Sequence, residues 1–305
     1  MHYITAYYKF LPITNVEATK IFFTDIAKKT GTKGLIILAS EGFNSTVSNK
    51  SFDELQKYKS AVLSHFDLSS LNFKDSESEV APFKWLSIKT RTEIVTTGNN
   101  DLAINHSKNN HLSPEEWNKF VEHENPLIID TRNWYEYKIG TFEGALNPNT
   151  EKFTDFPKYM DSLKIEKKQK ILIFCTGGIR CEKGILELQD KGYSEVYQLD
   201  GGILNYIKEK PNELFKGECF VFDQRVSVDQ KLEPSRQYKL CPHCGQPGKT
   251  DIICKKCDSA EVICDGCYQL KWKQDTCSKN CANHYELNPF KKARQQKRPV
   301  QNSDH

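Results

Sequence analysis

The chain has 305 residues, of which 27% are charged, and its formal net charge is +3. This length predicts two or three domains, each able to bury a core of its own. The small net charge does not require a nucleic-acid partner, so any basic binding surface must be local. Apolar stretches such as 35–39 and 171–175 are too short to span a bilayer, and residues 1–8 do not resemble a signal peptide. We therefore expect a cytoplasmic protein without a membrane partner.

Residues 1–98 are predicted to form a first domain with a ferredoxin-like or acylphosphatase-like α+β fold. Alternating or helical spacing of apolar residues predicts, in the order strand, helix, strand, helix and strand, elements over residues 3–10, 16–29, 34–39, 52–66 and 85–95. A further strand between 39 and 52 would complete the order that is typical of this sandwich.

The second predicted domain covers residues 112–211 and follows a polar linker at 98–111. It begins with a helix that Ser113 caps, with Glu116 completing a capping box. Apolar strands then alternate with helices, which predicts an α/β fold with a parallel sheet and chemistry at the carboxyl ends of its strands. The clearest strands are residues 126–130, 171–174 and 193–199.

The strand at 171–174 ends at Cys175, and a Thr-Gly-Gly turn connects this cysteine to a helix that contains Arg180. Loop N–H groups and the helix N-terminus can converge on the sulfur and lower the thiol pKa, which favours the thiolate. A buried structural cysteine is the alternative, but such a turn would not need the neighbouring Arg180. We interpret Cys175 as a reactive thiol. Cys181, next in the helix, is either a resolving thiol or a packing residue.

A third predicted domain, residues 238–290, follows a linker at 212–239 and contains eight cysteines in close pairs. The pairs are Cys241 with Cys244, Cys254 with Cys257, Cys264 with Cys267, and Cys277 with Cys281. Two pairs can fill the tetrahedral shell of one zinc ion, so we expect two structural zinc ions. The sequence leaves open which pairs join, and redox disulfides or an iron–sulfur centre are alternatives. His243 and His284 are expected to be spectators.

Lysines and aromatic residues are interleaved with these cysteines, and a flexible basic tail is predicted over residues 291–305. Lysines can contact phosphates and aromatic side chains can stack on unpaired bases, as recognition of a single-stranded RNA loop requires. A solvated surface on a small domain explains the same residues equally well.

The second domain resembles a rhodanese domain. Asp130 and Arg132 match the entry motif, residues 175–180 match the six-residue active loop, and residues 200–202 match the exit motif. By this resemblance Cys175 carries sulfur or another covalent adduct.

The whole chain resembles the rhodanese-containing tRNA uridine hydroxylase family, which installs a 5-hydroxyl group on the wobble uridine of certain tRNAs. The matching segments are residues 33–44, 91–95, 112–117, 130–133, 139–142, 175–183 and 220–225, together with the cysteine-rich end. One departure is Ser45, where the family usually has glycine. The resemblance implies oxygen-dependent hydroxylation of the wobble uridine (position 34) in the tRNA anticodon loop. From the motifs and the position of Cys181 beside the loop, we expect Cys175, Arg180, Asp130 and Cys181 to form the catalytic site.

The residues supply a nucleophile, but no flavin, dinucleotide or His-His-carboxylate motif is evident, so no organic cofactor is expected beside molecular oxygen. Cys175 would either add to uracil C6 and make C5 electron-rich, or carry an activated oxygen or sulfur species. Arg180 would orient an anion or the base edge, and loop amides would stabilise negative charge. Rival hypotheses are a sulfurtransferase that relays persulfide sulfur and a non-catalytic tRNA-binding adaptor. No obligate protein partner is evident.

Overall fold

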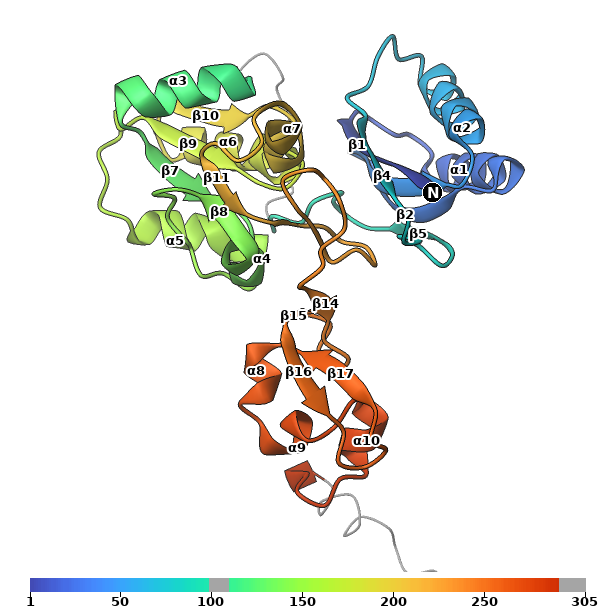
Figure 1. The fold of residues 1–305 in the computed structure, drawn as a ribbon. Helices are drawn as coiled ribbons and strands as arrows, with labels where there is room; N and C mark the ends of the chain where they lie inside the picture. The colour runs from blue at the N-terminus through green and yellow to red at the C-terminus, as the bar shows by residue number, and fades with distance from the viewer. Residues whose placement is uncertain (99–109, 291–305) are drawn as a thin grey trace, which may run out of the picture. The chain divides into compact units, whose positions relative to one another are not determined.

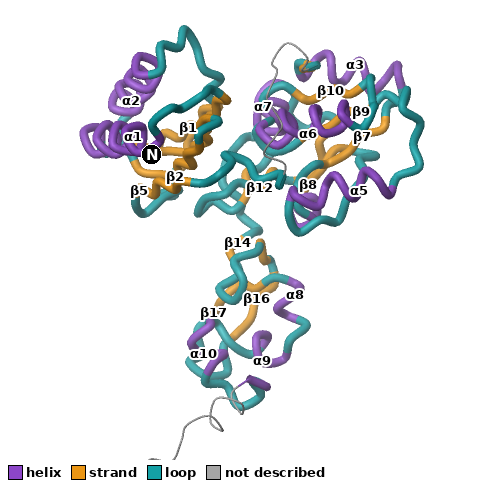
Figure 2. Tube along the Cα trace, turned by 180° about the vertical axis from the view of Figure 1, so that it is seen from behind, coloured by secondary structure: helices purple, strands orange, loops and turns teal. Residues whose placement is uncertain are grey.

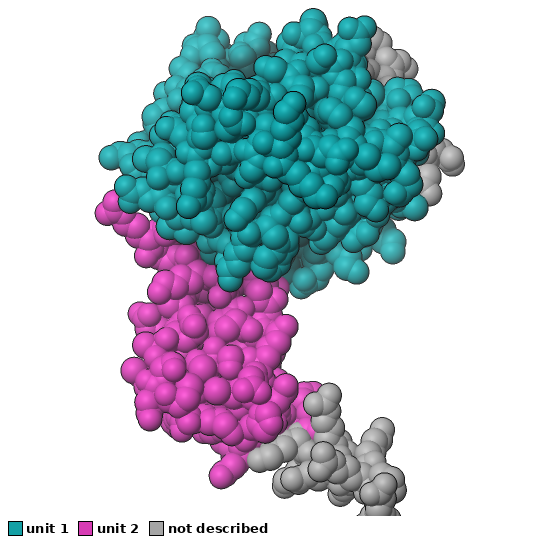
Figure 3. Space-filling view, turned by 90° about the vertical axis from the view of Figure 1, so that its right-hand side faces the viewer, with its two compact units in different colours: residues 1–234 teal, residues 235–305 magenta. Residues whose placement is uncertain are grey.

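The computed structural model describes residues 1–98 and 110–290, and its contacts divide the chain into two compact units after Pro234. Figure 3 shows the first unit in teal and the second in magenta. The basic tail predicted at 291–305 and most of the linker predicted at 98–111 lie outside the described residues. Among the helices in the described ranges, none combines the length and the apolar character needed to cross a membrane.

The first unit begins with an α+β layer whose five-stranded sheet has the order β4-β1-β3-β2-β5 (Figure 1). Its elements are β1 (His2–Phe10), α1 (Val16–Thr30), β2 (Lys33–Ala39), β3 (Gly42–Asn49), α2 (Phe52–His65), β4 (Lys74–Ser78) and β5 (Leu86–Thr90). The strand pairs are antiparallel except β2 with β5. The expected acylphosphatase-like fold class is confirmed.

One strand of this sheet differs from the prediction. The strand that follows α2 is β4, a polar strand at one edge of the sheet. Its sequence has no alternation of apolar residues from which a strand could be predicted. The strand predicted within 85–95 is β5, which adds to the opposite edge of the sheet and pairs parallel with β2. Both strands lie at sheet edges, where one side of the backbone has no strand partner and the pattern of burial is weak.

The two helices of this layer lie together against one face of the sheet (Figure 2). Asn15 caps α1 by accepting a hydrogen bond from the Ala18 N–H, and Gly31 ends it in the left-handed conformation with φ of 70°. Buried Phe23 and Tyr58 project from α1 and α2 into the core that covers the sheet. Burial of this face accounts for the stability of the layer.

The α/β layer that follows contains the predicted parallel sheet, and the structure gives it four strands in the order β6-β10-β9-β7. Its elements and the segments that follow them are β6 (His111–Leu112), α3 (Pro114–Glu124), β7 (Leu127–Asp130), α4 (Trp134–Ile139), β8 (Gly140–Phe142), η2 (Phe153–Asp155), α5 (Phe156–Ser162), β9 (Ile171–Phe174), α6 (Ile179–Asp190), β10 (Val196–Leu199), α7 (Gly202–Glu209), β11 (Phe215–Gly217), β12 (Cys219–Phe220) and β13 (Ser227–Val228). The predicted capping box of Ser113 and Glu116 starts α3. Helices cover both faces of the sheet, because α3 and α7 belong to one core and α5 and α6 to another.

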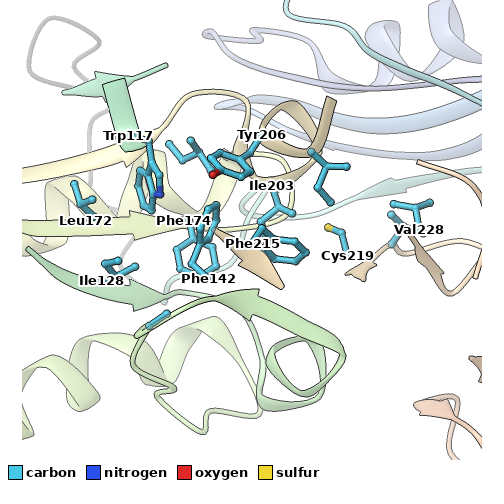
Figure 4. Close-up of a cluster of buried hydrophobic side chains, with 14 residues drawn as sticks. Trp117, Ile128, Phe142, Leu172, Phe174, Ile203, Tyr206, Phe215, Cys219 and Val228 are labelled. Carbon is cyan, nitrogen blue, oxygen red and sulfur yellow. The ribbon is translucent and has the colours of Figure 1, made fainter. Parts of the chain in front are cut away.

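An aromatic cluster fixes the end of the central strand β9 (Figure 4). The Phe142 ring lies 4.8 Å from Phe174, 4.7 Å from Tyr206 and 5.4 Å from Phe215, measured between ring centroids in edge-on arrangements. Such arrangements stabilise by about 0.5–1.5 kcal/mol per pair beyond the burial of apolar area. Phe174 is the last residue of β9, so this packing fixes the backbone immediately before Cys175.

The second unit is small and contains β14 (Lys239–Leu240), β15 (Pro247–Gly248), β16 (Thr250–Ile253), β17 (Ala260–Ile263), α8 (Asp265–Tyr268), α9 (Lys271–Gln274) and α10 (Lys279–Asn283). Its buried cluster consists of Ile252 and Ile263 with the cysteines Cys241, Cys264 and Cys267. With Val262 and Ala282, which are also buried, these isoleucines are still too little apolar material to stabilise a domain without another source of free energy.

Candidate active site and metal-binding cysteines

The loop between β9 and α6 surrounds Cys175 with close backbone. Gly202, at the start of α7, has a φ of 67°, and a Cβ atom there would lie 2.6 Å from the Cys175 carbonyl oxygen and 2.7 Å from the Gly178 nitrogen. Only glycine permits this approach. The exit glycine pair therefore presses α7 against the active loop and fixes the shape of the loop.

The Cys175 thiol is buried, with 1% of the residue exposed, and its Sγ atom accepts a hydrogen bond from the Gly178 N–H at 3.1 Å. Burial by itself would raise the pKa of this thiol. A hydrogen bond from Cys181, the positive charge of Arg180 and loop N–H groups outweigh burial and lower the Cys175 pKa to about 5. Cys175 is therefore a thiolate at neutral pH.

Cys181 has the opposite character. Burial raises its pKa, and the neighbouring Cys175 raises it further. Its Sγ atom lies 3.7 Å from the Thr131 hydroxyl, and the residue is fully buried. Two adjacent thiols are thus held in different protonation states, with Cys181 donating to the Cys175 thiolate.

Arg180 is held by a carboxylate that sequence analysis did not single out. Its two terminal nitrogens donate to the Glu136 oxygens at 2.7 and 2.8 Å, and Glu136 is fully buried. Burial would raise the Glu136 pKa, but the charge and hydrogen bonds of Arg180 lower it overall. Glu136 is visible in the sequence only as the third residue of the helix that Asn133 begins, which gives no hint of Arg180.

Asp130 lies at the carboxyl end of β7 but is directed toward a different partner. Its carboxylate accepts from the Arg132 guanidinium at 2.6 Å and from the Thr141 hydroxyl at 3.0 Å, and Asp130 and Arg132 are both fully buried. Arg132 also donates to the Gly140 carbonyl at 2.6 Å. The pair braces the turn beside the active loop, and its described hydrogen bonds do not reach Cys175.

The α+β layer also reaches the active loop, through residues that sequence analysis missed. The Tyr8 hydroxyl donates to Glu182 of α6 at 2.9 Å. The Lys74 ammonium lies 5.0 Å from the centre of the Tyr8 ring, and its side chain passes Gly177 of the loop. The contacts of Tyr8 with Glu182 and of Lys74 with Gly177 join residues more than about 100 positions apart, so no local sequence pattern could indicate them.

A buried ion-pair cluster fastens the same layer to α6. The Lys183 ammonium lies 2.6 Å from a Glu93 oxygen and 2.9 Å from a Glu41 oxygen, and only 1% of Lys183 is exposed. Lys183 follows the active loop by one helical turn, so the cluster links the position of α6 to the α+β layer.

The eight paired cysteines assemble into two groups of four, and the pairs cross over. The first and third pairs form one group, and the second and fourth pairs form the other, with the sulfur atoms of each group within 4.8 Å of one another. The groups are Cys241, Cys244, Cys264 and Cys267, and Cys254, Cys257, Cys277 and Cys281.

The spacing of these thiols fits a bound metal ion. The sulfur atoms of Cys244 and Cys264 lie 3.4 Å apart, and those of Cys277 and Cys281 lie 3.7 Å apart. Four thiolates on tetrahedral zinc, with bonds of about 2.3 Å, would be roughly 3.8 Å apart, whereas a disulfide is about 2 Å long. All eleven cysteines are free thiols. Both groups can therefore hold a metal ion.

The two histidines expected to be spectators lie outside both thiol groups. The His243 Nε2 atom lies 2.7 Å from the Thr276 carbonyl oxygen, so this ring supports the fold of the unit. Cys219, outside the pairs, is fully buried, and burial raises its pKa to about 12.

Three family models match the chain in succession. Residues 2–94 match a UPF0176 acylphosphatase-like domain, residues 113–209 a rhodanese-like domain, and residues 216–282 a rhodanese C-terminal region. Among solved structures, a rhodanese-like domain from Anabaena sp. covers 35% of this chain and 78% of its own, at 22% identity and a TM-score of 0.30. That score is too low to support an argument.

Curated relatives match nearly the whole chain and carry one name, tRNA uridine(34) hydroxylase. The relative from Bdellovibrio bacteriovorus is 53% identical over 98% of this chain and 86% of its own length. The relative from Pelagibacter ubique is 40% identical over 87% of each chain, and that from Legionella pneumophila is 41% identical over 78% of this chain and 94% of its own. The chain belongs to the tRNA uridine(34) hydroxylase family, as the resemblance in its sequence predicted.

Proposed function

We propose that this protein hydroxylates C5 of uridine 34 in the tRNA anticodon loop, with molecular oxygen as co-substrate and Cys175 as the nucleophile. Family membership supports the reaction and the substrate. The observation that carries the role of Cys175 is its environment: a thiol whose pKa falls to about 5 at the end of a parallel strand. Such a thiolate is nucleophilic at neutral pH without a separate general base.

In this proposal the thiolate adds to C6 of the uracil ring. The S–C6 bond forms, the C5–C6 double bond breaks, and its electron pair is shared between C5 and the C4 oxygen. C5 becomes the electron-rich carbon that bonds to one atom of molecular oxygen, while the second atom leaves as water with two electrons and two protons supplied by an external reductant of the thiol class. Loss of the C5 proton and departure of the Cys175 thiolate then restore the aromatic ring, so the cysteine is unchanged after each turnover.

The other three site residues receive distinct roles. Arg180, fixed by Glu136, orients the base edge or an anion beside the thiolate. Cys181 donates a hydrogen bond that keeps Cys175 deprotonated. Asp130 acts as a positioning residue, because its carboxylate binds Arg132 and Thr141 in the turn next to the loop.

The cysteine-rich unit is proposed to hold two structural zinc ions, one in each group of four thiols. Four thiolates complete the zinc shell and leave no position for a catalytic water. Lysines and Tyr268 on this unit would contact the tRNA; the exposed Tyr268 ring is available for stacking on a base. We propose domain limits of 1–98, 112–211 and 238–290, and a cytoplasmic location, where tRNA is modified.

The decisive experiment is nucleoside mass analysis of tRNA from a strain that lacks this protein, complemented with variants. Cys175→Ala should abolish 5-hydroxyuridine and its derivatives, while tRNA affinity stays near that of the wild type because phosphate contacts dominate RNA affinity. Cys219→Ala is the matched control, since this buried cysteine has a raised pKa. Loss of thiolated nucleosides instead would favour sulfur transfer, and an unchanged nucleoside profile in the deletion strain would favour an adaptor.

A further inference from the structure

Lys74, the first residue of β4, extends from the α+β layer to the active loop of the α/β layer. A Cβ atom placed on Gly177 would lie 3.9 Å from the Lys74 Cδ atom and 4.0 Å from its Cε atom. The Lys74 ammonium group lies 5.0 Å from the centre of the Tyr8 ring. The Tyr8 hydroxyl in turn contacts the loop, because a Cβ atom placed on Gly178 would lie 3.0 Å from its oxygen. Lys74 therefore lies beside the loop that holds Cys175.

The other cations and donors around this loop are already engaged. Arg180 uses both terminal nitrogens on Glu136, and Lys183 is bound between Glu93 and Glu41. The Gly178 N–H is directed at the Cys175 sulfur. Each of these interactions stabilises the site in the absence of substrate.

Lys74 differs, because no carboxylate in the described parts of the chain lies within ion-pair distance of its ammonium group. The adjacent Asp75 is instead bound by Lys59 at 2.8 Å. Burial lowers the Lys74 pKa to about 8, although the negative charges of Asp200, Cys175 and Glu182 act to raise it. Lys74 also lines a polar cleft between β1, β4 and α7, together with Asn72, Asn205 and Lys208. The cleft itself contains no residue of the cysteine loop, so the proximity of Lys74 to that loop rests on its contact with Gly177.

We propose that Lys74 is a catalytic residue that the α+β layer supplies to the cysteine loop, binding the C4 oxygen of the uracil ring. The inference rests on the proposed hydroxylation. When the Cys175 sulfur bonds to C6 and the C5–C6 double bond breaks, the electron pair moves toward the C4 oxygen. The ammonium donates a hydrogen bond to that oxyanion and retains its proton, so no further reactant is needed.

This role explains why the two layers meet at the loop. A uracil positioned by the α/β layer alone would find a nucleophile, but Arg180, the charged donor of that layer beside the thiolate, is already neutralised by Glu136. Lys74 supplies an unpaired charge from the α+β layer, in a partly shielded position where a charge-assisted hydrogen bond is stronger than in water. The site is complete only with residues from both layers.

The test compares Lys74→Ala, Lys74→Arg and the control Lys89→Ala in single-turnover hydroxylation of tRNA. Lys89 is an exposed lysine on β5, so the control removes the same charge from the same layer. Lys74→Ala should slow the step at saturating tRNA about 100-fold, the usual cost of one oxyanion donor, with the Kd for tRNA changed by less than about threefold. Lys74→Arg should recover part of the rate, and Lys89→Ala should match the wild type.

A Lys74→Ala protein as fast as the wild type would overturn the proposal. So would a loss that comes entirely from weaker tRNA binding, or an arginine variant as slow as the alanine variant. Far-ultraviolet circular dichroism and thermal unfolding of each variant establish that the fold is intact. Failure of the wild-type protein to form 5-hydroxyuridine would instead refute the proposed function, so the wild-type reaction separates the two failures.

Discussion

The α/β layer and the cysteine-rich unit use the same side chain in opposite ways. Around Cys175, a packed aromatic core and a glycine-shaped loop give one sulfur several donors, and a second thiol remains protonated beside it. In the second unit, sulfur atoms converge in fours around little apolar material. Cysteine becomes a nucleophile where the fold is already stable and its donors are fixed, and a metal ligand where the fold needs the metal.

The largest expected difference between the two regions is their response to removal of metal. Each structural zinc site contributes about 10 kcal/mol or more of folding free energy in small zinc domains, so a chelator should unfold residues 235–290 and leave 1–98 and 110–234 folded. Limited proteolysis with and without chelator would show this, and metal analysis of the untreated protein should give about two zinc ions per chain. Re-adding zinc is the control. Stoichiometric iron with visible charge-transfer absorption would contradict the zinc assignment.

Substitution in the Arg180–Glu136 pair tests how much this buried ion pair stabilises the region of the cysteine loop. Glu136→Gln leaves a buried guanidinium without its countercharge, which should lower the free energy of unfolding by about 3 kcal/mol. Glu115→Gln is the control, because this exposed carboxylate binds Lys119 and Lys210 on the surface, where solvent screens the ion pairs, and should leave stability close to that of the wild type. Denaturant unfolding measures both. Equal effects of the two substitutions would contradict the comparison.

The smallest expected effect concerns the proton on Cys175. Its alkylation by iodoacetamide should increase as pH rises through about 5 and level off above, because the thiolate is the reacting form. Cys181→Ala removes a donor that favours the thiolate, so the midpoint should move upward by about one pKa unit, equivalent to about 1.4 kcal/mol. Cys181→Ser retains a donor and should shift it less.

Other ionisable groups interact with the same thiol and stay unchanged in this comparison: Arg180, Tyr8, Lys74 and Cys219. A midpoint near 9 in the wild-type protein would show that burial dominates and that Cys175 is not activated.

Local chemistry explains which features could be predicted from the sequence. The Cys175 loop and the capped start of α3 are formed by residues close together in the sequence, so both could be predicted from local sequence patterns. The crossed grouping of the cysteines could not be predicted, because each pair offers two thiolates and can share a zinc ion with any other pair. The roles of Glu136, Tyr8 and Lys74 in the site could not be predicted, because their contacts depend on which strands and helices pack together. The polar strand β4 was missed for want of an apolar alternation.

The cluster of Lys183 with Glu41 and Glu93 bears on how far this protein can be divided. Lys183 is 1% exposed and takes its countercharges from outside its own α/β layer. A rhodanese domain excised for separate expression, or exchanged with that of a distant relative, would carry an uncompensated lysine on the helix that follows the active loop. A domain boundary drawn by fold alone would separate Lys183 from Glu41 and Glu93, so the α+β and rhodanese parts are best expressed and engineered as one piece.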